Sequence, residues 1–320
     1  NNAVRVFNIS SNAICGVSGL TIANGAATWP SHGGAIYNAG FLTLSDCTIS
    51  DSHTSSGFGG GIYNAGVLVL NGSTLTGNRA SGGDGGRGAG GGGGGAGLGG
   101  AIYSRGPNVA MTNCTFSRNE AVGGNGGWTS GGNNTFGGYG GGPTGGNGGG
   151  LCEPGQNGGY GSGGGGGGGW WETPYETICL GKSGGNGGFG GGGGGAGDYI
   201  GGAVGGTGGD FGGDANNQDG GGGAGLGGGF FVESGDVTIV NCTFTQNGVT
   251  AGAGAQSLGG AIFRMGGIVR LLNSLITGQA GGWGTCDVVG GVYSLGHNLV
   301  SDAFCFDEGD CDLVFVDASA

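Results

Sequence analysis

A short pattern of alternating apolar and polar residues recurs along most of the chain. Its first clear copy, residues 33–50, reads GGAIYNAGFLTLSDCTIS, and related segments begin at Gly59, Gly99, Gly227 and Gly259. A unit of this length that returns with substitutions is typical of a solenoid or another repeat array.

Each copy predicts three short strands joined by turns, because the apolar residues alternate and the period of a helix is absent. In the first copy, alternation places Leu42, Leu44 and Ile49 on one side of the strands. It places Thr43 and Thr48 on the other side. One unit cannot bury its apolar side, so successive units must stack, like residue above like residue. Three strands per turn, stacked in parallel about 4.8 Å apart, predict an all-β parallel β-helix.

Aligning the first strand of every unit predicts about seven coils. The residues expected to share one interior column are Val6, Ile36, Ile62, Ile102, Phe230, Ile262 and Val292. Two gaps between them are long and rich in glycine, so we interpret both as insertions between coils. The expected organisation is N-terminal coils at 1–122, with a short glycine-rich loop at 81–98, a glycine-rich lobe at 123–227, and C-terminal coils at 228–320.

The composition is dominated by glycine, which supplies 99 of the 320 residues. A collagen fold is excluded because there is no Gly-X-Y repeat and the chain has only five prolines. Charged residues make up 9% of the chain and the net charge is −12. This charge argues against a nucleic-acid partner, since phosphate binding needs a basic surface. No apolar run approaches the roughly 20 residues of a membrane span.

Inside the long glycine tract, the motif GGNGG recurs, starting at Gly123, Gly145 and Gly184. Glycine-rich chains are flexible linkers by default, but a linker has no use for regularly placed aromatic residues and two cysteines. We therefore expect an ordered bundle of extended, polyproline-II-like segments, which glycine allows to pack closely. The aromatic residues expected to make external contacts are Trp128, Tyr139, Tyr160, Trp170, Trp171 and Phe189.

The nine cysteines divide into groups. Cys47, Cys114 and Cys242 occupy one inward position of the repeat and are expected to be buried free thiols. The candidate disulfides are Cys152 with Cys179 in the lobe and Cys286 with Cys305 near the C-terminal end. Cys15 and Cys311 are left without an assigned partner. Disulfides favour an oxidising, extracellular setting, so we expect a secreted or cell-surface protein.

Candidate chemistry is sparse, and no cofactor is expected. Two acidic groups leave a calcium site open as an alternative: Asp210, Asp214 and Asp219, and Asp307, Glu308, Asp310 and Asp312. Solvated acidic turns explain the same residues. Polysaccharide cleavage on a β-helix needs clustered carboxylates or a base beside calcium ligands. Arg105 and Arg264 occupy similar turns of different coils without paired acids, so we do not expect an enzyme.

Hydroxyl residues occupy the outward positions of the third strand in two ranks. The first rank is Thr21, Thr48, Thr74, Thr115 and Thr243, and the second is Ser50, Thr76, Ser117, Thr245 and Thr277. A flat Thr-x-Thr face is typical of ice-binding solenoids, whereas the preference of threonine for exposed strands explains the same residues without any function. Ice binding is therefore kept as a lesser alternative.

The repeat GGAIYN-x-G-x-L-T-L-x-x-C-T-I-S, the opening RVFNIS…VSGLTIANG and the tail GGVYSLGHNLVSDAFC…FVDASA carry a family resemblance. They resemble the polymorphic outer-membrane-protein-like repeats of secreted, right-handed parallel β-helix proteins of bacteria. The resemblance covers the coils and not the long glycine insertion. It implies right-handed coiling, export, and a role in surface structure or adhesion, and it supplies no catalytic residues.

Two functions are compatible with this pattern. We expect first an extracellular structural protein, a subunit of a surface fibre that self-associates through its β-helix ends and its glycine-rich lobe, because the repeat pattern reaches both ends of the chain. The alternative is a monomeric adhesin whose lobe binds a glycan or another surface. A polysaccharide lyase or hydrolase is a third, lesser reading.

Overall fold

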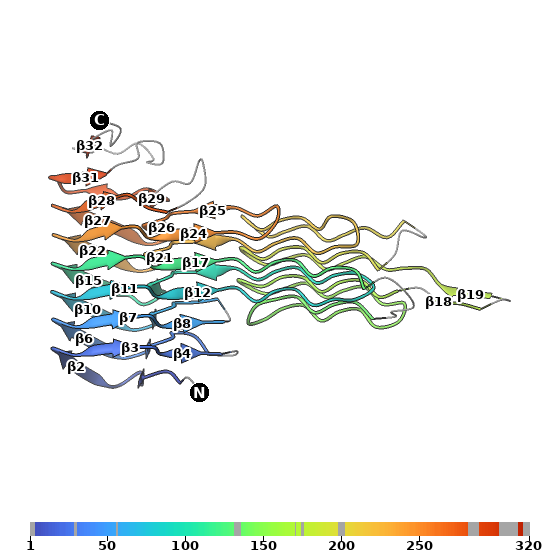
Figure 1. The fold of residues 1–320 in the computed structure, drawn as a ribbon, viewed down its shortest axis with the longest axis horizontal. Coiled ribbons are helices and arrows are strands. Elements are labelled where there is room, and N and C mark those ends of the chain that lie inside the picture. Colours follow the sequence, from blue (N-terminus) through green and yellow to red (C-terminus); the bar gives the residue numbers. More distant parts are fainter. Residues whose placement is uncertain are drawn as a thin grey trace.

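The computed structural model describes residues 4–28, 31–55, 57–130, 136–169, 171–173, 176–197, 202–280, 288–300 and 313–315. The regular elements in these ranges are all β-strands. Strands from successive repeats stack in parallel, and each turn of the chain adds one strand to each of several sheets (Figure 1). The architecture is therefore a parallel β-helix, from one side of which a lobe of extended glycine-rich segments projects (Figure 1).

Three sheets enclose the interior of the solenoid. The first sheet contains, in spatial order, β1 (Phe7–Ile9), β5 (Ile36–Asn38), β9 (Ile62–Asn64), β14 (Ile102–Ser104), β21 (Phe230–Val232), β26 (Ile262–Arg264) and β29 (Val288–Val289). The second contains β2 (Ile14–Ser18), β6 (Phe41–Ser45), β10 (Val67–Asn71), β15 (Asn108–Thr112), β22 (Asp236–Val240), β27 (Ile268–Leu272) and β30 (Tyr293–Ser294). The third contains β3 (Thr21–Ala23), β7 (Thr48–Ser50), β11 (Thr74–Thr76), β16 (Thr115–Ser117), β23 (Thr243–Thr245), β28 (Leu275–Thr277), β31 (Asn298–Val300) and β32 (Leu313–Phe315).

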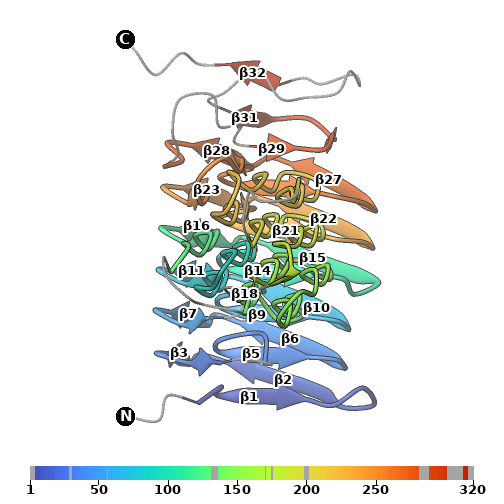
Figure 2. The same cartoon turned by 90° about the vertical axis from the view of Figure 1, so that its right-hand side faces the viewer.

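Smaller sheets extend the coils toward the lobe. A fourth sheet orders β24 (Gly248–Thr250), β17 (Glu120–Val122), β12 (Arg79–Ser81), β8 (His53–Thr54) and β4 (Ala26–Ala27). A fifth contains β13 (Gly97–Leu98), β20 (Gly225–Leu226) and β25 (Ser257–Leu258). Two strands within the lobe pair antiparallel, β18 (Trp171–Thr173) and β19 (Glu176–Cys179). Viewed along the lobe, its segments lie over the middle coils of the stack (Figure 2).

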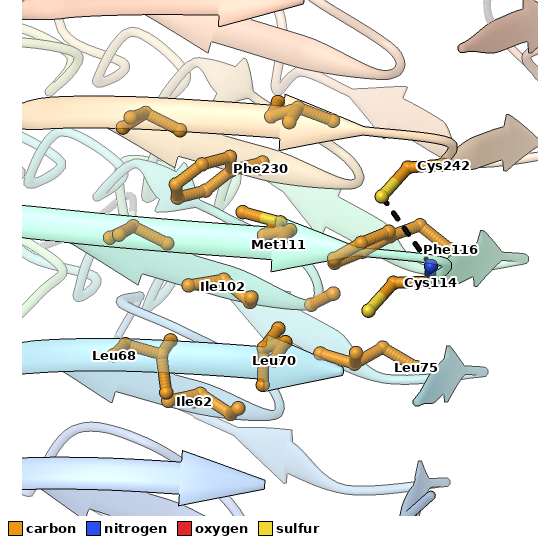
Figure 3. Close-up of a cluster of buried hydrophobic side chains, with 14 of the residues drawn as sticks. Ile62, Leu68, Leu70, Leu75, Ile102, Met111, Cys114, Phe116, Phe230 and Cys242 are labelled. Carbon is orange, nitrogen blue, oxygen red and sulfur yellow. Dashed lines mark hydrogen bonds between the residues drawn. The ribbon is translucent and has the colours of Figure 1, made fainter. Parts of the chain in front are cut away.

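One interior column runs through the middle of the first sheet. Ile36, Ile62, Ile102, Phe230 and Ile262 pair in that order, each with the next, and all five side chains are 0% exposed. Figure 3 shows three of them, Ile62, Ile102 and Phe230, among the apolar side chains that fill the space between sheets. Like side chains stack because the period-two alternation keeps the same face inward on every rung.

The interior column departs from the sequence-based alignment at both ends. Phe7, not Val6, pairs with Ile36, and Val6 is 45% exposed. At the other end Val288 pairs with Ile262, whereas Val292 lies just before Tyr293 of the second sheet. Sequence could not place these rungs, because several apolar residues stand near each expected position and only the pairing partner fixes the rung. Val292 is buried in the interior, 8% exposed, although Val288 is the residue that pairs with Ile262.

Polar side chains at the ends of the first-sheet strands form a ladder of their own. Asn38 donates from Nδ2 to Oδ1 of Asn64 at 2.7 Å, and Asn64 donates to the hydroxyl of Ser104 at 3.0 Å. These residues are fully buried, so the ladder supplies the partners that buried amides require. On the solvent-exposed surface of the solenoid, Asn241 and Asn273 form a similar ladder, in which Asn273 donates to Asn241 at 2.7 Å. Both have positive φ values, a turn conformation that asparagine tolerates.

Candidate functional site: the glycine-rich lobe and its outer face

The lobe is built from extended segments whose hydrogen bonds have a period of three residues. Segment 90–97 has three neighbours, residues 161–167, 218–224 and 83–86. The amides of Gly90, Gly93 and Ala96 donate to the first neighbour, those of Gly91, Gly94 and Gly97 to the second, and those of Gly92 and Gly95 to the third. Three residues per turn without hydrogen bonds inside the segment is the geometry of polyproline II. The lobe is thus a hydrogen-bonded bundle, in which every backbone amide of this segment has a partner.

Glycine is required inside this bundle because the segments approach backbone to backbone. A β-carbon added at Gly93 would collide with the carbonyl oxygen of Gly192, and one at Gly163 would collide with that of Gly93. Gly93, Gly163 and Gly192 are buried. No residue with a side chain fits at such positions without displacing a neighbouring segment.

The third position of the GGNGG motif, and of its variants GGDGG at 82–86 and GQNGG at 155–159, joins one segment to the next. Asp84 accepts a hydrogen bond from the amide of Asn125 at 2.7 Å. In the same way Asn157 accepts from the amide of Asn186 at 2.8 Å, and Asn186 accepts from that of Thr207 at 3.0 Å. At these three copies the short polar side chain therefore caps an amide of the neighbouring segment at the edge of the bundle.

The residue three positions after this polar side chain lies on the same side of its segment, because the segment turns once every three residues. On one pair of neighbouring segments these residues are Arg87 and Trp128, with the guanidinium 5.3 Å from the centre of the Trp128 ring. On another pair they are Tyr160 and Phe189, whose rings stack 5.1 Å apart. Arg87 and Trp128 are exposed to solvent, whereas Tyr160 and Phe189 pack against the solenoid.

Tyr160 and Phe189 attach the lobe to the solenoid. The outward side of the first sheet carries a stack of rings, in which Tyr103 lies 5.2 Å from Phe231. Tyr160 packs edge-on against Phe58 at 5.9 Å, and Phe189 against Phe231 at 6.2 Å. These rings form a second apolar core between solenoid and lobe. Tyr160 and Phe189, which were expected to make external contacts, are instead partly buried against this junction.

Buried phenols and one imidazole line the same junction. The Tyr103 hydroxyl donates to Oε2 of Glu233, and burial is the main cause that raises the pKa of Tyr103 and of Tyr160. His32 stacks on Phe58 at 4.7 Å. Burial, followed by the positive charges of two arginines, lowers the pKa of His32 to about 4. These groups keep their neutral forms at neutral pH, so the junction behaves as an apolar core.

The outer face of the lobe is formed by three neighbouring segments. Residues 84–87 lie between segments 123–128 and 136–139. The amide of Gly85 donates to the carbonyl of Asn125 on one side, and the amide of Gly86 donates to the carbonyl of Tyr139 on the other. We call the exposed residues of these segments the outer face: Asp84, Arg87, Asn125, Trp128, Phe136 and Tyr139. Trp128 and Phe136 are each 62% exposed and Tyr139 is 68% exposed. Exposed rings gathered in this way mark an interaction surface.

Sequence reasoning found Trp128 and Tyr139 but missed Arg87 and Phe136 as members of this face. The signal for Arg87 was present, since GGDGGR at 82–87 has the same form as GGNGGW at 123–128. Trp170 and the side chain of Trp171 lie outside the part of the chain that the structure describes.

The cysteines separate into two kinds. Cys47, Cys114 and Cys242 are buried and free, and the amide of Cys114 approaches Sγ of Cys242 at 3.4 Å (Figure 3). Cys15 is also free and partly buried. Cys152 is disulfide-bonded, but the side chain of Cys179 is not among those described, so their pairing stays a prediction. Cys286, Cys305 and Cys311 lie outside the described residues.

Two of the three acidic residues of the lobe that were candidate calcium ligands, Asp214 and Asp219, accept hydrogen bonds from backbone amides. Asp214 accepts from the amide of Gly208 at 2.8 Å, and Asp219 accepts from that of Thr129 at 2.9 Å. Within the described ranges, no three His, Cys, Asp or Glu side chains are grouped as a metal site would require. The second acidic group, at 307–312, lies outside those ranges.

Arg105 and Arg264 also have structural partners. Arg105 donates to the Tyr63 hydroxyl at 3.5 Å, and Arg264 donates to the carbonyl of Gly267 at 2.6 Å.

The described part of the chain contains no helix long and apolar enough to cross a membrane. Comparison with family models, with curated proteins and with solved structures finds no match. The fold and this face define the chain by class: a parallel β-solenoid bearing a glycine-rich lobe with an exposed aromatic face.

Proposed function

We propose that this chain is a non-enzymatic adhesive protein that acts outside the cell. In this proposal the solenoid is a spine and the outer face of the lobe binds polysaccharide. The observation that carries it is the gathering of Trp128, Phe136 and Tyr139 beside Arg87 on three neighbouring segments. The disulfide at Cys152 supports an oxidising, extracellular setting.

The construction of the lobe favours binding. Its segments are held by hydrogen bonds between backbones, so the exposed rings project from an ordered support rather than from a flexible loop. A preorganised surface loses little conformational entropy when a ligand binds, which leaves more of the contact energy for affinity. The lobe also projects away from the solenoid, which leaves its outer face accessible to a large partner (Figure 1).

The chemistry of the outer face fits a saccharide chain. Sugar rings have an apolar face that packs on aromatic rings, and their hydroxyls need hydrogen-bond partners at the rim. Arg87, Asp84 and Asn125 supply charged and polar groups in the same rows as the rings. A polymer needs an open surface of this kind rather than a deep pocket.

The experiment is a binding assay of the purified chain with insoluble and soluble polysaccharides of neutral and acidic composition. We expect retention of the wild-type chain and a loss of about tenfold in affinity for the variant W128A/Y139A, which corresponds to about 1.4 kcal/mol. The matched control is Y293A, which removes a ring that is 60% exposed on the solenoid. Equal binding by wild type and W128A/Y139A would refute the proposal.

Self-association is the second candidate, because the same exposed rings can face a second copy of the chain. Negative-stain microscopy and sedimentation of the wild-type chain test it. Regular fibres that disappear in W128A/Y139A would favour assembly through the lobe, whereas isolated rods with a side lobe that bind polysaccharide would favour adhesion.

A further inference from the structure

The outward side of the third sheet presents a regular array of hydroxyl groups. Thr115 pairs with Thr243, and Ser117 with Thr245, with the same register kept from β3 to β28. The outward residues in spatial order are Thr21 and Ala23, Thr48 and Ser50, Thr74 and Thr76, Thr115 and Ser117, Thr243 and Thr245, and Leu275 and Thr277. All but Ser50 keep part of their surface exposed.

The strand preference of threonine does not explain this array, because the second sheet of the same coils lacks it. Its outward positions on β6, β10, β15, β22 and β27 are Phe41, Thr43, Ser45, Val67, Val69, Asn71, Asn108, Ala110, Thr112, Asp236, Thr238, Val240, Ile268, Arg270 and Leu272. A general preference for threonine on exposed strands would act on both sheets alike. The hydroxyls are instead concentrated on one face, and none of the outward positions from β3 to β28 carries a charge.

The spacing of the array is set by the backbone. Outward residues two apart on one strand lie about 6.7 Å apart, and equivalent residues on neighbouring strands lie about 4.8 Å apart. Both distances lie close to repeats of the oxygen lattice in hexagonal ice. Threonine supplies a hydroxyl that bonds water and a methyl group beside it that does not compete for that bond. Ser117 and Thr76 are themselves joined at 2.9 Å, so neighbouring hydroxyls hold defined positions.

We propose that this face, the outward side of β11, β16, β23 and β28, binds ice by ordering a layer of water in register with the crystal. The proposal is independent of the outer face of the lobe. The lobe leaves these hydroxyls partly exposed, so both surfaces are available on one molecule.

The test is partition of the purified chain into slowly growing ice, together with inhibition of ice recrystallisation. Wild type is expected to enter the ice and to keep ice grains small, while serum albumin is excluded. The variant T115Y/T243Y places two large rings on neighbouring rungs of the array, and we expect its enrichment in ice to fall by about tenfold. The matched control A110Y/T238Y makes the same change on the second sheet of the same two coils and is expected to retain full enrichment.

Circular dichroism checks that each variant keeps its β-structure. If T115Y/T243Y does not fold, the single change T115K, which puts a charge among the hydroxyls, takes its place with the same expected loss. Exclusion of the wild type from ice would overturn the proposal. Full enrichment of a folded T115Y/T243Y or T115K, or equal loss in A110Y/T238Y, would overturn it as well.

Discussion

Asn119 donates from Nδ2 to Oδ1 of Asn247 at 2.9 Å, although 128 residues separate the two. Asn78 joins the same ladder by donating to Asn119, also at 2.9 Å. All three side chains are 0% exposed. The coil that follows the lobe thus stacks in register on the coil that precedes it, and the buried side-chain amides of Asn119 and Asn247 join the two.

Replacing Asn119 with alanine should destabilise the solenoid strongly. The change removes the acceptor for Asn78 and the donor to Asn247, and buried polar groups left without partners cost about 1–3 kcal/mol each. Denaturant unfolding should show a loss of about 3 kcal/mol. The control N71A changes an exposed asparagine and should alter stability by less than about 0.5 kcal/mol. Similar stability of N119A and wild type would contradict the ladder.

The glycines inside the lobe should not tolerate even a methyl group. In G93A the new β-carbon meets the carbonyl oxygen of Gly192, so the bundle must open. Hydrogen exchange should show lost protection for the amides of 90–97 and their neighbours, while the solenoid strands stay protected. The control G16A adds a methyl group on β2, where nothing lies within 4 Å, and should leave exchange unchanged. Unaltered protection of the lobe in G93A would show that the segments are not closely packed.

The ring stack at the junction should carry much of the attachment of the lobe. Phe231 is 0% exposed and contacts Tyr103, Phe263 and Phe189. We expect F231A to lower the free energy of unfolding by about 3–5 kcal/mol, the usual cost of emptying a buried phenylalanine site. The control F41A removes a ring that is 42% exposed on the second sheet and should cost far less. An equal loss of unfolding free energy in F231A and F41A would show that the ring stack at the junction contributes no more to stability than an exposed ring.

His32 should make the protein less stable in mild acid. Its folded pKa, about 4, lies below the unfolded value of about 6.5, so the fold favours the neutral ring. The stabilisation is complete above pH 6.5 and is lost as pH falls toward 4, because the unfolded chain takes up the proton first. The change should be about 2 kcal/mol, allowing for the partial exposure of the ring.

The variant H32F keeps a ring between Phe58 and Tyr63 and removes the titrating group. Urea midpoints at pH 7 and pH 4.5 should differ less for H32F than for wild type. The control H53Q changes an exposed histidine and should keep the wild-type difference. An identical pH dependence in H32F and wild type would exclude His32 as the source.

The middle coils could be predicted because their alternation is local and repeated. Ile36 and Ile62 each follow a glycine pair and precede a tyrosine, so the same motif marks the same rung. Phe7 could not be placed in this way, since Val4, Val6 and Phe7 all offer apolar side chains and the pairing with Ile36 makes the choice.

The structure of the lobe could likewise be predicted only in part from the sequence. Its repeated motif predicted extended segments, but the destinations of their amides are carbonyls far away in the sequence, such as that of Gly221 for Gly94. Tyr160 and Trp128 occupy the same motif position, yet one is packed on Phe58 and the other is 62% exposed.

The sequence by itself determined the stacking of the repeats, the inward residues of the middle coils and the ranks of hydroxyl residues on the third strand, because these depend on side chains only a few residues apart. The tertiary structure decided the end registers, the place of residues 83–97 within the lobe, and the division of aromatic residues between junction and outer face. These depend on which distant segments lie side by side, and a backbone of glycine carries no side-chain signal for that choice.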